Sequence, residues 1–176
     1  MITKPVRRIA YAGVFIAVSI ILTRLASQMI YIGGVQILRL SFGEIPLILS
    51  GIILGPFYGA ACGALADLIG FPINAQGAYF PGFTLSAALV GMLPGLMTRL
   101  VKKEWTWLSL SIVIGITTLI TSVILNTIWL HMIIGKAVAM LLPARIIAAL
   151  ILTPIYISVV KLFLKHYKHI ENRMLQ

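Results

Sequence analysis

The sequence contains few acidic residues and almost no cysteine. Only four of its 176 residues are Asp or Glu, compared with fourteen Lys or Arg, and Cys62 is the single cysteine. One thiol excludes a disulfide framework within the chain and a metal site built from cysteines. Residues 68–98 and 105–135 contain no Asp, Glu, Lys or Arg, and each stretch is longer than the roughly 20 apolar residues that cross a bilayer as a helix. These absences exclude an ordinary soluble domain.

Several enzyme signatures are also missing. The sequence contains no G-x-x-x-x-G-K-[ST] phosphate loop, no H-E-x-x-H, no G-x-S-x-G and no histidine and carboxylate cluster with the spacing of a metal site. The chain therefore cannot hydrolyse ATP through a phosphate loop of its own, and an intramembrane hydrolase is poorly supported. We expect no enzymatic activity, no cofactor and no metal in this chain.

The residues that are present indicate a membrane protein with several spans. The chain is 60% hydrophobic and 10% charged, with a mean hydropathy of +1.06, far outside the range of soluble domains. Its net charge of +10 does not indicate nucleic-acid binding, because most basic residues flank apolar segments, as the positive-inside rule describes. The residues that report orientation and contact with membrane lipid in this way are Lys4, Arg7, Arg8, Arg99, Lys102, Lys103, Lys161, Lys165, Lys168 and Arg173.

We expect one all-α integral membrane domain, residues 1–176, with six transmembrane helices. The region 41–70 is compatible with one helix or with two short ones divided at Gly55-Pro56. Charge favours two, because Lys102 and Lys103 lie on the side of a cytoplasmic N-terminus only after an even number of spans. Both termini are then cytoplasmic. The other predicted helices are residues 8–26, 82–101, 107–130 and 137 or 144 to 164, the last with Pro143 as a candidate first-turn proline.

Six charged residues interrupt the apolar sequence, and this topology gathers them on the outer side. An ionisable group at membrane depth is costly unless it is paired or faces a polar cavity, so each is a candidate functional residue. The outer connections mix glycine with aromatic and amide groups, which suits a cover over a small-molecule pocket. We therefore predict a pocket toward the outer face. Its charges, four cations and two carboxylates that together favour an anionic ligand, are Arg24, Arg39, Glu44, Asp67, Lys136 and Arg145.

Each candidate also has a structural alternative. Ser41-Phe42-Gly43-Glu44 matches a capping box at the start of a helix, and Asp67 could neutralise Arg24 or Arg145 in a structural pair. The Arg24 side chain could extend to the membrane interface, and Tyr79 and Trp129 could belong to the aromatic belt there. Asn126 could form a hydrogen bond between two helices, and His131 could simply be solvated.

Small residues recur at helical spacing in two places. Gly13 and Ala17 form one small-xxx-small pair, and Gly59 and Gly63 form another. Such pairs allow another helix to approach closely. The sequence leaves open whether that helix belongs to this chain or to a partner subunit.

Residues 39–98 carry a family resemblance, which is densest in SFGEIP, GALADLIG and QGAYFPGFTLSAAL. This stretch resembles the folate-specific substrate-binding subunits, or S components, of energy-coupling factor (ECF) transporters. The resemblance implies a subunit of the bacterial cell membrane that captures folate or a reduced folate from outside. It also implies a transmembrane coupling subunit and two cytoplasmic ATPases as partners, and delivery of the vitamin by toppling of the bound subunit. Gly13 and Ala17 are the nearest match to the docking motif of the first helix in this family.

The resemblance also implies a binding site. Its motifs cover Asp67, Gln76, Tyr79, Phe80 and Phe83, and Asp67 is the candidate acceptor for the donor edge of the pterin. Aromatic residues would stack on the rings, and cations would bind the two carboxylates of the ligand. The full set of candidate substrate-binding residues is Arg24, Arg39, Asp67, Gln76, Tyr79, Phe80, Phe83, Asn126, Trp129, His131, Lys136 and Arg145.

Two other functions remain open at this point. An S component for another vitamin, such as thiamine or riboflavin, would share the six-helix plan without requiring paired cations. A small membrane enzyme or assembly factor would use the outer charges only to hold its structure.

Overall fold

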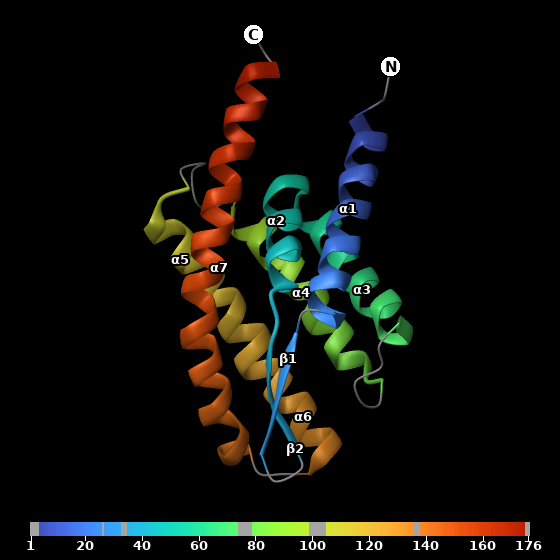
Figure 1. The fold of residues 1–176 in the computed structure, drawn as a ribbon, viewed down its shortest axis with the longest axis vertical. Coiled ribbons are helices and arrows are strands. Elements are labelled where there is room, and N and C mark those ends of the chain that lie inside the picture. The colour runs from blue at the N-terminus through green and yellow to red at the C-terminus, as the bar shows by residue number, and fades with distance from the viewer. Residues whose placement is uncertain are drawn as a thin grey trace.

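The structure is a computed structural model that describes residues 4–25, 27–32, 35–73, 79–98, 105–135 and 138–174, with the backbone alone described for the two strands. Figure 1 shows an elongated bundle whose two termini lie at one end, with a hairpin and α6 at the other. The elements in chain order are α1 (Lys4–Arg24), β1 (Gln28–Ile32), β2 (Val35–Leu40), α2 (Glu44–Leu54), α3 (Pro56–Ile73), α4 (Pro81–Met97), α5 (Trp107–Thr118), the π-helix η1 (Leu119–Leu125), α6 (Asn126–Ile134) and α7 (Val138–Met174).

The helical character predicted from composition is confirmed. In the described part of the chain, four helices are long and apolar enough to cross a membrane, and α2 and α4 are shorter apolar helices. The element ends differ from the prediction where the sequence has no strong stop signal. The last helix begins at Val138, so Pro143 lies inside it and is not a first-turn proline as predicted.

The division of region 41–70 into two helices is also confirmed. Gly55 separates α2 from α3 with φ of 102°, a backbone conformation that glycine adopts without steric cost. Its N–H donates to the Gly51 carbonyl at 3.1 Å, which closes the end of α2. The short helix α2 is buried along most of its length and packs against α1, α3, α4 and α7. Neighbouring helices therefore shield a segment that is too short to cross a bilayer alone.

An antiparallel hairpin adds a β element that the all-α prediction did not include. Strands β1 and β2 pair with Gln28 opposite Leu40 and Met29 opposite Arg39. Strand β2 leads directly into α2, and the junction is tied to two other helices. Tyr156 on α7 donates to the Ser41 carbonyl at 2.6 Å, and Ser19 on α1 donates to the Gly43 carbonyl at 2.8 Å. The start of α2 is thereby fixed from both sides.

Glycines bring α2, α3 and α4 into backbone contact. A Cβ atom added to Gly91 of α4 would lie 2.0 Å from the Gly59 carbonyl oxygen, and one added to Gly51 of α2 would lie 1.9 Å from the Gly91 carbonyl oxygen. On Gly63 it would lie 2.0 Å from the Ala87 carbonyl oxygen. Gly59 and Gly63 therefore pack within this chain, which is the internal alternative that the sequence left open.

The core lies between α2, α5 and α7. Ile48, Leu110, Ile114 and Val160 are fully buried there, together with the ring of Tyr156, which is 1% exposed. These residues hold α7 against the rest of the bundle. The packed layer closes one side of a large cavity, which contains the candidate site.

Candidate functional site

A cavity of about 450 Å³ lies inside the bundle, within the size range of about 300–1,000 Å³ that is typical of small-molecule pockets. Its walls come from all the helices, α1 to α7 with η1, from the junction between β2 and α2, and from the segment that precedes α4. The candidates from the sequence that line it are Arg24, Asp67, Tyr79, Phe80, Phe83, Asn126 and Arg145.

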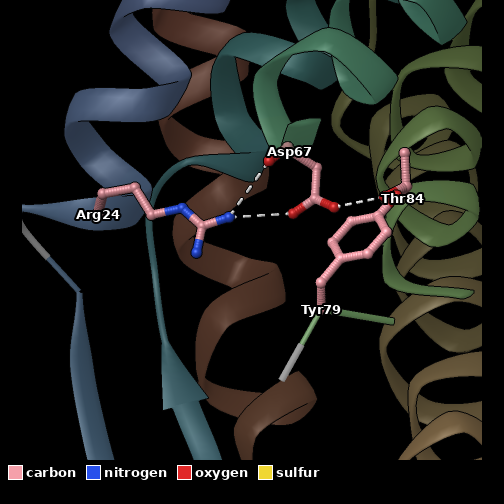
Figure 2. A network of polar contacts seen from close by, with 4 residues as sticks. All are labelled: Arg24, Asp67, Tyr79 and Thr84. Carbon is pink, nitrogen blue, oxygen red and sulfur yellow. Dashed lines mark hydrogen bonds and ion pairs between the residues drawn. The ribbon is translucent and has the colours of Figure 1, made fainter. Parts of the chain in front are cut away.

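One wall carries an ion pair between α1 and α3. Nη2 of Arg24 lies 3.1 Å from Oδ1 of Asp67, and the hydroxyl of Thr84 on α4 donates to Oδ2 at 2.7 Å. The Tyr79 hydroxyl lies 3.1 Å from that of Thr84, so Tyr79 is the donor in this contact because Thr84 gives its proton to Asp67. Figure 2 shows Arg24 and Thr84 meeting the Asp67 carboxylate from opposite sides.

Small residues on α3 make this arrangement possible. Arg24 is the last residue of α1 and is only 6% exposed. A Cβ on Gly70 would lie 3.0 Å from Nε of Arg24, so glycine there lets the guanidinium lie against the helix. Asp67 and Gly70 are three residues apart and share one face of α3. Asp67 therefore neutralises Arg24, as the structural alternative stated, and at the same time borders the cavity.

The second predicted carboxylate of the pocket is also in its lining, although it was not among the candidate substrate-binding residues. Glu44 lines the cavity at the start of α2, where its Oε1 accepts from the Ser122 hydroxyl at 3.1 Å. It also attracts Arg145 of α7 electrostatically. The predicted capping box is not formed, because Gly43 is the N-cap and no side chain caps α2. The motif marks the start of the helix correctly, and Glu44 borders the pocket, as its grouping with the other outer charges predicted.

A π-helix supplies another polar wall. Thr118 at the end of α5, Ser122 in η1 and Asn126 at the start of α6 are spaced four residues apart, and all three line the cavity. Nη1 of Arg145 donates to the Ser122 carbonyl at 3.3 Å. The side-chain atoms Thr118 Oγ1, Asn126 Oδ1 and Arg145 Nε are buried without a hydrogen-bond partner in the structure. An unsatisfied buried polar group costs about 1–3 kcal/mol, so a ligand that meets these atoms gains that energy.

Aromatic rings form the wall of the cavity at the N-terminal end of α4. Phe80 lies 6.1 Å from Phe83 and 5.8 Å from Trp129 between ring centroids. Trp129 donates from Nε1 to the Ser86 hydroxyl at 3.0 Å. A Cβ on Gly82 would lie 2.6 Å from the Trp129 ring, so the glycine makes room for the indole. Trp129 therefore supports the lining ring of Phe80 from behind.

The structure changes the charge balance expected for the pocket. Arg24 forms an ion pair with Asp67, and Arg145 is attracted electrostatically by Glu44. The described part of the pocket therefore holds two pairs of opposite charge. The predicted surplus of two positive charges rests on Arg39 and Lys136. The Arg39 side chain, Lys136 and Gln76 all lie outside what the structure describes.

The other predicted residues lie apart from the cavity lining. His131 is exposed on α6, next to Gly135, whose positive φ of 70° ends that helix. Gly13 and Ala17 lie on the exposed face of α1, and nothing lies within 4 Å of a Cβ added to Gly13. Within the described ranges, no group of three His, Cys, Asp or Glu side chains is placed to hold a metal ion.

The fold and site define the class of protein: a helical, multi-pass membrane protein with a pocket of small-molecule size between its helices. The family described as "ECF transporter, substrate-specific component" matches residues 7–164. The chain therefore belongs to this family of transporter components.

Individual proteins that resemble this chain are folate transporters by name. The "Folate transporter FolT" of Clostridium novyi (strain NT) is 34% identical over 157 residues, which cover 89% of this chain and 87% of the relative. A "Folate transporter FolT" of Leuconostoc mesenteroides is 28% identical and covers 87% of this chain and 82% of its own length. The "Crystal structure of FolT bound with folic acid" superimposes with a TM-score of 0.75 at 33% identity, over 86% of this chain and 90% of that one.

Proposed function

We propose that this chain is the folate-binding S component of an ECF transporter and takes folate or a reduced folate into its central cavity. The observation that carries the proposal is the cavity itself, which combines an aromatic wall with two carboxylates and two arginines inside a bundle of this family. A flat heterocycle with both donors and acceptors fits such a lining. The relatives named as folate transporters support the same ligand.

In this proposal some pocket residues contact the pterin ring of folate, and others contact its tail, which carries two carboxylates. Phe80 and Phe83 stack on the rings, with Trp129 in support, and the charged pairs lie along the cavity. The two carboxylates of the tail require cations that are not already beside a carboxylate in the pocket. Arg39 and Lys136, both in the outer connections, are our candidates for that role.

We also propose six spans in a bacterial cell membrane, with both termini cytoplasmic and the pocket toward the outer face. The arrangement in which both termini lie at one end and the hairpin at the other supports this orientation (Figure 1). Arg7 and Arg8 near the start and Lys165 near the end are exposed at the terminal end, where the positive-inside rule places them.

Binding of folate is the direct test of the proposed function. We expect detergent-purified protein to bind folic acid and 5-formyltetrahydrofolate saturably, and to bind thiamine and riboflavin at least about 100-fold more weakly, because their polar groups leave buried charges unmatched. Calorimetric titration with the four vitamins measures this. Saturable riboflavin or thiamine binding in place of folate would favour the other S components, and absence of binding by monodisperse, folded protein would reject a vitamin carrier.

The partners in the proposal are a transmembrane coupling subunit and two cytoplasmic ATPases, which would supply the ATP hydrolysis and drive toppling and release. The exposed face around Gly13 and Ala17 on α1 supports docking there, because small residues allow close helix approach.

Larger side chains on this face of α1 should block folate transport without weakening folate binding. We expect Gly13→Leu combined with Ala17→Leu to abolish folate uptake by cells that contain the partner subunits, while folate affinity of the purified protein stays at the wild-type value. The matched control is Ala61→Leu, at an exposed position of α3. Normal uptake by the double variant would remove this face from the docking surface, and loss of folding would assign it to packing.

A further inference from the structure

A second candidate site lies outside the cavity, on the surface that α5 and α7 share. We propose that Trp107, Lys161 and Lys165 bind the headgroup of an anionic phospholipid from the surrounding membrane. The acyl chains of this lipid lie along the exposed apolar side chains of the same two helices. Such a site is independent of the cavity and of folate binding.

A contact between a cation and an aromatic ring forms the centre of this site. The Lys161 ammonium nitrogen lies 3.9 Å from the centroid of the Trp107 ring, within the range of a cation–π interaction. The contact joins the first residue of α5 to the C-terminal half of α7, and the two helices pack against each other (Figure 1). The Trp107 ring therefore holds the half-buried Lys161 in place without neutralising its charge.

The start of α5 is fixed from the side of the core. The Trp105 side chain packs against the hydrophobic core, and the hydroxyl of Thr106, the N-cap, accepts from the Ser109 N–H at 3.2 Å. Trp107 follows these two residues and is 55% exposed. An indole with one part on the protein and another part accessible is typical of a membrane–water interface. The ring is thus placed where lipid headgroups lie.

The charge of this surface is positive. Lys165 is exposed and lies one turn after Lys161 on the same face of α7. The acidic side chains that the structure describes both line the cavity instead. In the sequence, Glu104 before α5 is accompanied by Lys102 and Lys103. Lysines near a membrane surface attract anionic lipids, and a headgroup that carries its own cation gains less from them. The surface therefore favours a phospholipid such as phosphatidylglycerol over phosphatidylcholine.

Apolar side chains continue from the lysines away from the terminal end of the bundle. On α7, Ile147 and Ile151 are exposed and share a face with Lys161 at helical spacing. On α5, Leu108 and Ile112 are exposed in the first two turns. A phospholipid has the same polarity along its length: its phosphate oxygens accept from ammonium groups, and its acyl chains contact aliphatic side chains.

This surface is separate from the exposed face of α1. Figure 1 shows α5 and α7 on the other side of the bundle from α1. A lipid at α5 and α7 therefore leaves Gly13 and Ala17 free for the proposed docking. Its bound headgroup would hold this side of the bundle at a fixed depth in the bilayer.

The test compares two lipids with identical acyl chains, phosphatidylglycerol and phosphatidylcholine. Native mass spectrometry of the purified protein in detergent measures the Kd for the first bound molecule of each. We expect the wild type to prefer phosphatidylglycerol by about tenfold or more, as the attraction of two lysines implies. Lys161→Gln with Lys165→Gln should bring the ratio of the two Kd values close to one. Trp107→Leu should lower it less, because the charges remain but the ring that positions Lys161 is lost.

Two further double variants show whether the ratio reports this site. Arg7→Gln with Arg8→Gln removes the same charge from exposed positions of α1 at the same end of the bundle, and it should keep the wild-type ratio. Lys161→Arg with Lys165→Arg keeps the charge and should also keep the ratio. If replacement of the half-buried Lys161 prevents folding, Lys165→Gln alone, at an exposed position, should still lower the preference.

A wild type without a preference, or a double lysine variant that keeps it, would overturn the inference. An equal loss of preference in the α1 control would show attraction by net charge alone and would overturn it too. Displacement of phosphatidylglycerol by an equal concentration of inorganic phosphate would replace the lipid by a soluble anion. The Kd for folic acid, measured on the same preparations, should be equal in all of them. Failure of the lipid site and failure of folate binding are thereby distinguished.

Discussion

Replacing Gly91 by leucine is expected to prevent the chain from folding. Gly91 lies where α4 touches both α2 and α3, and a Cβ atom at this position would lie 2.0 Å from the Gly59 carbonyl oxygen. Backbone atoms of two other helices cannot move aside as a flexible side chain does. Alanine at this position should already cost about 1–3 kcal/mol through overpacking. Leucine should leave no monodisperse protein after extraction into detergent, as size-exclusion chromatography would show.

Gly115 offers a matched control for this substitution. It lies on α5, and nothing lies within 4 Å of a Cβ added to it. We expect Gly115→Leu to give wild-type yield and thermal stability. If Gly91→Leu were equally stable, the close contact of the three helices would be wrong.

Removing the Asp67 side chain is expected to have the second largest effect. Asp67→Ala leaves the Arg24 guanidinium, with its side chain 5% exposed, without its carboxylate partner. Loss of one member of a buried pair typically costs about 3–5 kcal/mol. The Thr84 hydroxyl loses its acceptor at the same time. We expect a lower thermal unfolding temperature together with loss of saturable folate binding, measured on the same detergent preparation.

A double variant distinguishes loss of the charge pair from loss of packing. Arg24→Met with Asp67→Leu removes both charges and should recover part of the thermal stability, because an apolar pair avoids the cost of burying ions. It should not recover binding if the wall must be polar. An Asp67→Ala protein with the wild-type unfolding temperature would show that the ion pair contributes nothing to stability.

The broad architecture could be predicted because membrane helices leave strong signals in a sequence. Long stretches without charge predicted the helices. Because Lys102 and Lys103 were expected on the same side as the N-terminus, an even number of spans had to precede them, which divided region 41–70 into two helices. The hairpin was not predicted. Its strands are short, and their pairing depends on contacts with the bundle that local pattern does not encode. The π-helix was missed for a similar reason, since one widened turn leaves the apolar pattern almost unchanged.

The site was predictable as a set of residues but not as a set of pairs. Asp67, Arg24 and Arg145 were chosen because charge is costly in a membrane, and the structure places all three at the cavity. Sequence could not show that Arg24 faces Asp67 while Arg145 faces Glu44. Glu44 was predicted together with these charges, but its spacing from Ser41 also fitted a local capping motif. Contacts over long sequence separation decided between the two explanations, as the Ser122 to Glu44 hydrogen bond illustrates.

The short helix α2 has a consequence for the biogenesis of the protein. At 11 residues it extends about 17 Å, against about 30 Å of hydrocarbon, and most of its surface is covered by other helices. It therefore has little surface for lipid and no length with which to insert as an independent segment. We expect it to reach its depth only after α3 has been synthesised and α1 is in place, and to become protected from protease late. The carboxylate of Glu44, at its first residue, would meet Arg145 only after α7 has been synthesised.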